Sequence, residues 1–214
     1  MIVSVVNNKG GIGKTTTTVI LAQTALQRGV QRILVVDACG QQNAVDYLMI
    51  GSQALFDGID VMPSPGKTPD PKILQSFDLT IIDTPPHTES IVVRNVINVA
   101  DVVVVPYMLE KHALMGLDEV FAIIPPEKTI PLCVLPRNAN SYTKVLMEDA
   151  RKKINKLGVQ FLSWPNYSRI EKNLGNRDDF FKGLTDAEME RFMVLINKIL
   201  PKRGAGKKNG KKIV

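Results

Sequence analysis

The feature that most limits how this chain folds is the regular alternation of short apolar runs with longer segments of helical pattern. Runs rich in β-branched residues predict buried strands at 2–6, 32–37, 79–83, 101–106, 131–136 and 159–162. Helices are predicted at 15–28, 89–98, 111–124, 142–157 and 186–200. Strands with so few polar residues suit a parallel sheet covered on both faces. The sequence therefore predicts an α/β fold with a doubly wound, mostly parallel sheet and helices on both faces.

Length and composition indicate a single domain at 1–200, with the proline-rich stretch 63–72 as a surface excursion. The 214 residues are 44% apolar, which is enough for one substantial core. No apolar run reaches the roughly 18 residues of a membrane span. The first residues lack a basic n-region and a cleavage site, so we do not expect export. The two cysteines, Cys39 and Cys133, form no CxxC pair and are expected to be reduced. We expect a cytoplasmic protein.

The net charge is concentrated in the segment 201–214, PKRGAGKKNGKKIV. The chain has 27 basic and 21 acidic residues, a net charge of +6. Six basic residues and no acidic ones lie in this segment: Lys202, Arg203, Lys207, Lys208, Lys211 and Lys212. A segment so poor in apolar residues cannot bury a face and is expected to be disordered. It is either a solvated tail or an arm that binds polyanions such as DNA phosphates.

A glycine-rich loop, NNKGGIGKTTTT (7–18), joins the first predicted strand to the first predicted helix. Its glycines allow backbone N–H groups to surround an anion, and the helix N-terminus adds partial positive charge. Lys14 is expected to reach the β- and γ-phosphates of a nucleotide, and the Thr15 hydroxyl to ligate Mg²⁺. The usual pattern, GxxxxGK[ST], has a glycine where this chain has Asn8. A second lysine, Lys9, is not needed by such a loop.

The run KGGIGKTT (9–16) resembles the signature of the deviant Walker ATPases, which include ParA-type partition proteins, MinD and the nitrogenase iron protein. The resemblance spans roughly residues 1–200 and implies a P-loop NTPase that binds ATP and Mg²⁺. It also implies that Lys9 reaches the phosphates of a second subunit, so that ATP binding builds a homodimer. The implied nucleotide-binding residues in this loop are Lys9, Gly10, Gly11, Ile12, Gly13, Lys14, Thr15 and Thr16. Without an N-terminal extension, the chain resembles the small partition ATPases that lack a regulatory domain.

Two further segments carry the resemblance. LTIIDTPP (79–86) is similar to the Walker B strand, and Asp83 at its end is expected to hold an Mg²⁺-bound water. The segment 100–120 resembles the part of partition proteins that follows. VLPRNAN (134–140) lies where relatives contact the base, which makes Arg137 and Asn138 candidates for adenine binding. Either residue could instead cap the helix predicted at 142–157.

The segment LVVDACGQQN (34–43) matches the end of an edge strand that relatives write as Asp-x-Asp-Pro. Asp37 matches the first aspartate, and we expect it to serve catalysis in the Mg²⁺ shell, with Lys9 and Lys14. Cys39 occupies the position of the second aspartate, which orients the attacking water in the family. A thiol with a pKa of about 8.5 is a poor substitute for a carboxylate. We expect slow, partner-stimulated hydrolysis unless Gln41 or Asn43 positions the water.

Basic residues gather in 142–157, namely Lys144, Arg151, Lys152, Lys153 and Lys156, and Arg169 and Lys172 follow. Such a cluster is a solvated helix face or a DNA-binding surface. With the basic tail, it makes Lys144, Lys152, Arg169, Lys172 and the six tail residues candidates for DNA contact. His87 and His112 have no neighbours at metal-ligand spacing and are interpreted as ordinary polar residues.

Four classes of function remain open. The favoured one is a ParA-like ATPase whose ATP dimer binds nonspecific DNA on the nucleoid and positions a plasmid, a chromosome locus or another cargo. The resemblance implies that a ParB-like centromere-binding or adaptor protein stimulates its hydrolysis. The others are a MinD-like factor, an iron–sulfur reductase and a nucleotide-dependent switch with little hydrolysis. The tail lacks the apolar helix of a membrane-cycling factor, and neither cysteine lies where the reductases place a cluster ligand.

Overall fold

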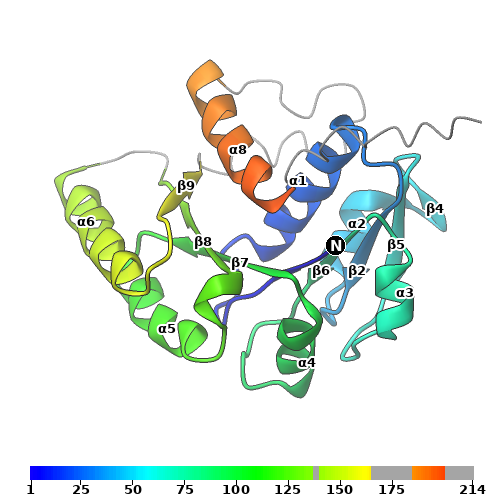
Figure 1. The fold of residues 1–214 in the computed structure, drawn as a ribbon, viewed down its shortest axis with the longest axis horizontal. Coiled ribbons are helices and arrows are strands. Elements are labelled where there is room, and N and C mark those ends of the chain that lie inside the picture. Colours follow the sequence, from blue (N-terminus) through cyan, green and yellow to red (C-terminus); the bar gives the residue numbers. More distant parts are fainter. Residues whose placement is uncertain (137–139, 165–184, 201–214) are drawn as a thin grey trace, which may run out of the picture.

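The computed structural model describes residues 1–136, 140–164 and 185–200 (Figure 1). Its centre is a seven-stranded sheet in the order β5-β2-β6-β1-β7-β8-β9, in which every neighbouring pair is parallel. The strands are β1 (Ile2–Val5), β2 (Ile33–Asp37), β5 (Ile59–Pro63), β6 (Leu79–Asp83), β7 (Val102–Met108), β8 (Thr129–Val134) and β9 (Leu162–Trp164). The predicted α/β fold with a parallel sheet is confirmed.

Helices cover both faces of this sheet, as predicted. One core contains residues of α1 (Lys14–Gln27), α2 (Asn43–Leu48) and α8 (Asp186–Ile199). The other contains residues of α3 (Pro71–Gln75), α4 (Ile91–Val99), α5 (Lys111–Phe121) and α6 (Ser141–Lys156). Figure 1 shows α1 and α8 together on one side of the sheet and α4 and α5 on the other. A short 3₁₀ helix, Pro126–Lys128, precedes β8.

The central strand β1 shows why these segments become buried strands. Its side chains alternate between the faces, so that Val3 and Val5 join the core under α1 while Ile2 joins the opposite core. Each is at most 4% exposed. Full burial of a Val or Ile side chain contributes about 1.5–3 kcal/mol, and both faces gain it only when helices cover both.

Several short elements were not predicted, and one of them, β5, forms an edge of the sheet that had been expected elsewhere. Strand β5 pairs with β2 and forms the edge of the sheet, so the prediction that 32–37 is the edge strand was wrong. Strand β9 starts at Leu162, at the end of the predicted 159–162. Asp70 accepts a hydrogen bond from the Lys72 amide (2.8 Å) and caps α3, so the excursion predicted at 63–72 is confined to 64–70.

A two-stranded antiparallel hairpin, β3 (Met49–Ile50) with β4 (Gln53–Ala54), lies beside the main sheet. Within the described ranges, no helix has the length and apolar character that a bilayer crossing requires. Cys39 and Cys133 are free thiols. The proposed basic tail, 201–214, lies outside the described residues.

Candidate functional site

The candidate site lies at the carboxyl edge of the sheet, where β1, β6 and β2 end side by side. The register pairs Val5 with Asp83 and Asp37 with Asp83, so the two predicted acidic residues are cross-strand neighbours. A cavity of about 1140 Å³ opens here. It is lined by the glycine-rich loop, by 39–43 after β2, by α2 and by 84–86 after β6. In open α/β sheets this edge is where ligands bind.

The glycine-rich loop has the conformation that its glycines allow. Gly11 has φ 69° and Gly13, the N-cap of α1, has φ 88°, both in the left-handed region that disfavours other residues. The side chain of Ile12 is 2% exposed and anchors the loop in the protein interior. Gly10, Gly11 and Gly13 line the cavity, and α1 begins beside them with its partial positive charge. This arrangement is suited to an anion such as a phosphate.

Lys14 supplies a full positive charge at the same place. It lines the cavity and is 8% exposed, and its Nζ donates a hydrogen bond to the carbonyl oxygen of Lys9 (2.8 Å). Burial lowers the pKa of Lys14, and the Asp83 carboxylate opposes that shift. A neutral carbonyl is a weaker acceptor than a phosphate oxygen. Lys14 is therefore placed to exchange its carbonyl partner for a phosphate.

Asp83 is a buried acidic residue at the end of β6. It is 1% exposed, its Oδ2 accepts a hydrogen bond from Thr15 Oγ1 (2.7 Å), and its Oδ1 makes no hydrogen bond of normal geometry among the described residues. Burial raises the pKa of Asp83 to about 7, although the hydrogen bond from Thr15 opposes the rise. A buried carboxylate with one unpartnered oxygen is stabilised by a nearby cation. Thr15 and Asp83 therefore fit the oxygen ligands and second shell that Mg²⁺ prefers.

Asp37 is held by the backbone of the segment that follows it. Its Oδ1 accepts from the Cys39 amide (3.1 Å), and its Oδ2 accepts from the amides of Ala44 (2.8 Å) and Val45 (3.2 Å). Burial raises the pKa of Asp37, and the hydrogen bonds oppose that effect. Asp37 thus positions 39–45 beside the cavity. The described residues hold no group of three or more His, Cys, Asp or Glu that could enclose a metal ion, so waters and phosphate oxygens would complete an Mg²⁺ shell here.

Comparison with known proteins assigns the chain to a protein family. The model of the AAA domain family AAA_31 matches residues 1–58 and 71–129, more than half of the chain. The chain belongs to this family. Within it, the chain resembles ParA-type partition proteins, as its similarity to two Soj proteins indicates.

Two curated relatives illustrate the similarity. Maintenance of carboxysome distribution protein A of Gloeobacter kilaueensis is 36% identical over 111 residues, covering 49% of this chain and 48% of that protein. The chromosome-partitioning ATPase Soj of Thermus thermophilus is 29% identical over 155 residues, covering 57% of this chain and 60% of Soj. The chain thus spans about half to three fifths of these relatives.

Two solved structures share the fold. A plasmid partition protein of Borrelia burgdorferi bound to AMPPNP has a TM-score of 0.65 at 20% identity, covering 93% of this chain and 98% of that chain. MinD of Pyrococcus horikoshii with Mg-ADP has a TM-score of 0.66 at 16% identity, covering 94% of this chain and 96% of MinD. The P-loop NTPase fold is therefore confirmed.

In this site the two predicted lysines lie in different positions. The cavity is lined by Lys14, Thr15 and Thr16, while Lys9 is absent from its lining and forms an ion pair with Glu110 (3.0 Å). Cys39 lines the cavity together with Gln41 and Asn43, the other candidates for positioning water. The second lysine therefore lies beside the cavity that the first one serves.

Some cavity residues were missed by sequence reasoning. Asp46 and Tyr47 line the cavity from α2, a helix too short to produce a recognisable helical pattern. Met108 and Val134 line it from the ends of β7 and β8. Both are the last residues of parallel strands that end at this edge, so the strand pattern could have indicated them.

The predicted base-binding residues precede α6, and their role stays a prediction. Arg137 and Asn138 lie outside the described residues. The alternative that one of them caps the following helix is wrong, because the N-cap of α6 is Asn140. Its side chain accepts from the Thr143 amide (2.8 Å), and the Asn140 amide donates to Thr143 Oγ1 (3.4 Å), forming a capping box.

The basic cluster of α6 is not one uniform face. Lys144 and Lys152 are exposed. Arg151 stacks over the ring of Phe161 at 5.0 Å, and Lys153 is tied to α5 by an ion pair with Asp118 (2.6 Å). The remaining DNA candidates lie outside the described residues: Arg169, Lys172, Lys202, Arg203, Lys207, Lys208, Lys211 and Lys212.

Proposed function

We propose that this ParA-type chain binds ATP and Mg²⁺ in the cavity and uses them to form a homodimer that binds DNA without sequence preference. The observation that carries the proposal is that two lysines of one loop occupy different positions relative to the cavity. Lys14 lines the cavity, whereas Lys9 lies outside it with a side chain 43% exposed. A lysine that the bound nucleotide does not need in its own subunit is available to the phosphates of another.

The chemistry of nucleotide binding follows from the residues that line the cavity. Lys14 exchanges the Lys9 carbonyl for the β- and γ-phosphates, and the loop amides donate to the same oxygens. Thr15 and Asp83 would hold Mg²⁺, directly or through its waters, and the ion would supply positive charge next to the phosphates. Asp37 keeps 39–45 against the cavity, so that Cys39, Gln41 and Asn43 face the site of hydrolysis.

Hydrolysis is proposed to be slow and to depend on a partner. The position that relatives use to orient the attacking water is Cys39, and loss of one such group lowers the rate by about 10²–10⁴-fold. This residue also favours a second candidate function, a nucleotide-dependent switch with little hydrolysis. Cys39→Asp separates the two, because it should raise single-turnover hydrolysis and shorten the life of the ATP dimer. An unchanged rate would mean that Gln41 or Asn43 already positions the water.

The proposed role is to position or segregate a cargo, which is a plasmid, a chromosome locus or another assembly. The support comes from relatives named for carboxysome distribution and chromosome partitioning. By the same similarity, a ParB-like or adaptor protein releases the dimer from DNA by stimulating hydrolysis, and the protein works on the nucleoid in the cytoplasm. A buried Cys133, whose pKa burial raises to about 12, argues against a shared iron–sulfur cluster.

The decisive experiment compares two lysine variants with AMPPNP by size-exclusion chromatography and light scattering. Lys14→Ala should abolish nucleotide binding, measured by titration with a fluorescent ATP analogue, because the phosphates lose their main side-chain counterion. Lys9→Ala should bind the analogue nearly as well as the wild type but remain monomeric. A Lys9→Ala protein that dimerises normally would refute the cross-subunit role.

A further inference from the structure

Three consecutive residues at the start of the glycine-rich loop are attached to the segment formed by β7 and α5. Asn7 is 3% exposed, and its Nδ2 donates to the carbonyl oxygen of Pro106 in β7 (2.8 Å). Its Oδ1 accepts a hydrogen bond from the Lys9 amide (3.0 Å). The backbone of Lys9 is therefore fixed relative to β7.

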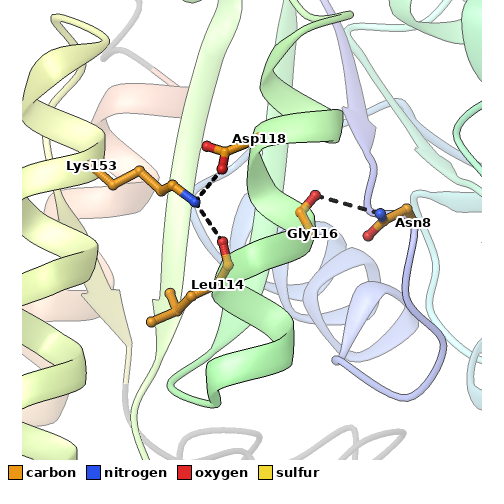
Figure 2. Close-up of polar contacts among 5 residues, drawn as sticks. All are labelled: Asn8, Leu114, Gly116, Asp118 and Lys153. Atoms are coloured by element: carbon orange, nitrogen blue, oxygen red, sulfur yellow. Dashed lines mark hydrogen bonds and ion pairs between the residues drawn. The ribbon is translucent and has the colours of Figure 1, made fainter.

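The residue between them, Asn8, is attached to the middle of α5. Its Nδ2 donates to Glu119 Oε2 (2.9 Å) and, at 3.4 Å, to the carbonyl oxygen of Gly116, as Figure 2 shows for Gly116. A Cβ on Gly116 would lie 3.2 Å from that Nδ2, so the missing side chain is what lets Asn8 approach the helix. On its other side, α5 is held by Lys153, whose Nζ donates to the Leu114 carbonyl (2.8 Å) and to Asp118 (Figure 2).

With its backbone held, Lys9 retains freedom mainly in its side chain, and that side chain is engaged. Its Nζ lies 3.0 Å from Oε2 of Glu110. Glu110 is the N-cap residue of α5, but its side chain makes no capping hydrogen bond, so the carboxylate is available for Lys9. The two side chains are 43% and 58% exposed, which makes this a weak ion pair that a polyphosphate can displace.

We propose that Glu110 holds Lys9 within its own subunit and thereby raises the ATP concentration at which the protein dimerises. The ammonium group that is proposed to reach the second subunit's phosphates must first leave the Glu110 carboxylate. Glu110 is thus a regulatory residue that acts through Lys9, without contacting nucleotide. This inference rests on the proposed function in one respect, the cross-subunit role of Lys9.

The test uses the full-length chain with Glu110→Gln, which keeps the shape of the side chain and removes its charge. Glu127→Gln is the matched control, because Glu127 is also an exposed acidic residue at the start of a helix and lies in the separate 3₁₀ turn. In nucleotide-free protein, the reactivity of the Lys9 amine toward an acetylating reagent is measured by mass spectrometry. In a second arm, the AMPPNP concentration for half-maximal dimerisation is measured by light scattering.

The Glu110→Gln variant should raise Lys9 reactivity and lower the half-maximal AMPPNP concentration, each by about 1.5- to 5-fold, the range of an exposed ion pair. The control should change neither. Unchanged Lys9 reactivity refutes the ion pair as a restraint, whatever the dimerisation result. Raised reactivity with an equal or higher AMPPNP requirement refutes the regulatory role, since Glu110 would then support the dimer. A wild type that stays monomeric refutes the dimer of the proposed function, and only the reactivity arm then measures the restraint.

Discussion

Replacement of Gly116 by alanine tests whether the contact between α5 and the glycine-rich loop shapes the site. Gly116 lies inside α5, where alanine is favoured over glycine by about 1 kcal/mol. In isolation, the substitution should therefore stabilise the protein. The added Cβ would, however, lie 3.2 Å from Nδ2 and 3.3 Å from Oδ1 of Asn8. Because both distances are tighter than ordinary contacts, the side chain of Asn8 must move.

The opposing magnitude comes from the hydrogen bonds that Asn8 would lose. The bond to Glu119 Oε2 is 2.9 Å long and charge-assisted but exposed, and the bond to the Gly116 carbonyl is long at 3.4 Å. Together they contribute about 1 kcal/mol. The loss offsets the gain in helix propensity, so Gly116→Ala should leave the free energy of unfolding within about 0.5 kcal/mol of the wild type.

A double-mutant cycle separates the two effects, measured by urea unfolding of nucleotide-free protein. In an Asn8→Ala background the methyl group meets no amide, so Gly116→Ala should stabilise by the full propensity gain of about 1 kcal/mol. The coupling energy is then about 1 kcal/mol. If Gly116→Ala stabilises equally in both backgrounds, Asn8 is not held against α5 and the reasoning fails. Asn8→Ala alone should also weaken binding of a fluorescent ATP analogue, because the loop loses one attachment.

Three other predictions concern charge. Burial raises the pKa of Asp83 from 3.8 to about 7, so the nucleotide-free folded state keeps a proton that the unfolded chain releases, and stability should fall between about pH 4 and pH 7. Relative to Asp83→Asn, that fall should be about 4 kcal/mol in urea unfolding, and parallel pH profiles would contradict it. Deletion of 202–214 should flatten the salt dependence of DNA affinity in fluorescence anisotropy, whereas an unchanged slope would remove the tail from the DNA site. Lys152→Gln should weaken DNA binding without a change in stability, while Lys153→Gln should lower the free energy of unfolding by about 1 kcal/mol, and equal stabilities would refute that distinction.

The sequence predicts the central strands well because their burial follows from composition alone. Strands β1, β2, β6, β7 and β8 are apolar on both faces and match predicted runs. Strand β5, in contrast, has exposed Asp60 and Pro63, since it lies at the edge and needs only one partner strand. Its sequence lacks the apolar run of a central strand, so this strand was not predicted.

The candidate site was predictable to the extent that it follows from the sheet. Once β1, β2 and β6 are parallel neighbours, their carboxyl ends must bring the loop, Asp37 and Asp83 together. The partners of the loop are different. Asn8 meets Gly116 and Lys9 meets Glu110 across more than one hundred residues of sequence, and no local spacing records such a contact. These contacts depend on how α5 packs, which only the folded structure provides.

The two lysines of the loop are also linked to each other, and this link bears on the order of nucleotide binding and dimerisation. Lys14 donates to the carbonyl of Lys9, while the side chain of Lys9 is paired with Glu110. Lys14 lines the cavity, so a nucleotide in its own subunit draws it away from that carbonyl, and the Lys9 backbone loses one of two restraints while Asn7 still holds its amide. Lys9 itself lies outside the cavity, and under the proposed function only a second, nucleotide-loaded subunit offers it phosphates. Each Lys9 then gains a phosphate partner only when the opposite subunit is loaded, so both cross-subunit contacts form only with two bound nucleotides, and the population of the full dimer should rise more steeply than nucleotide binding.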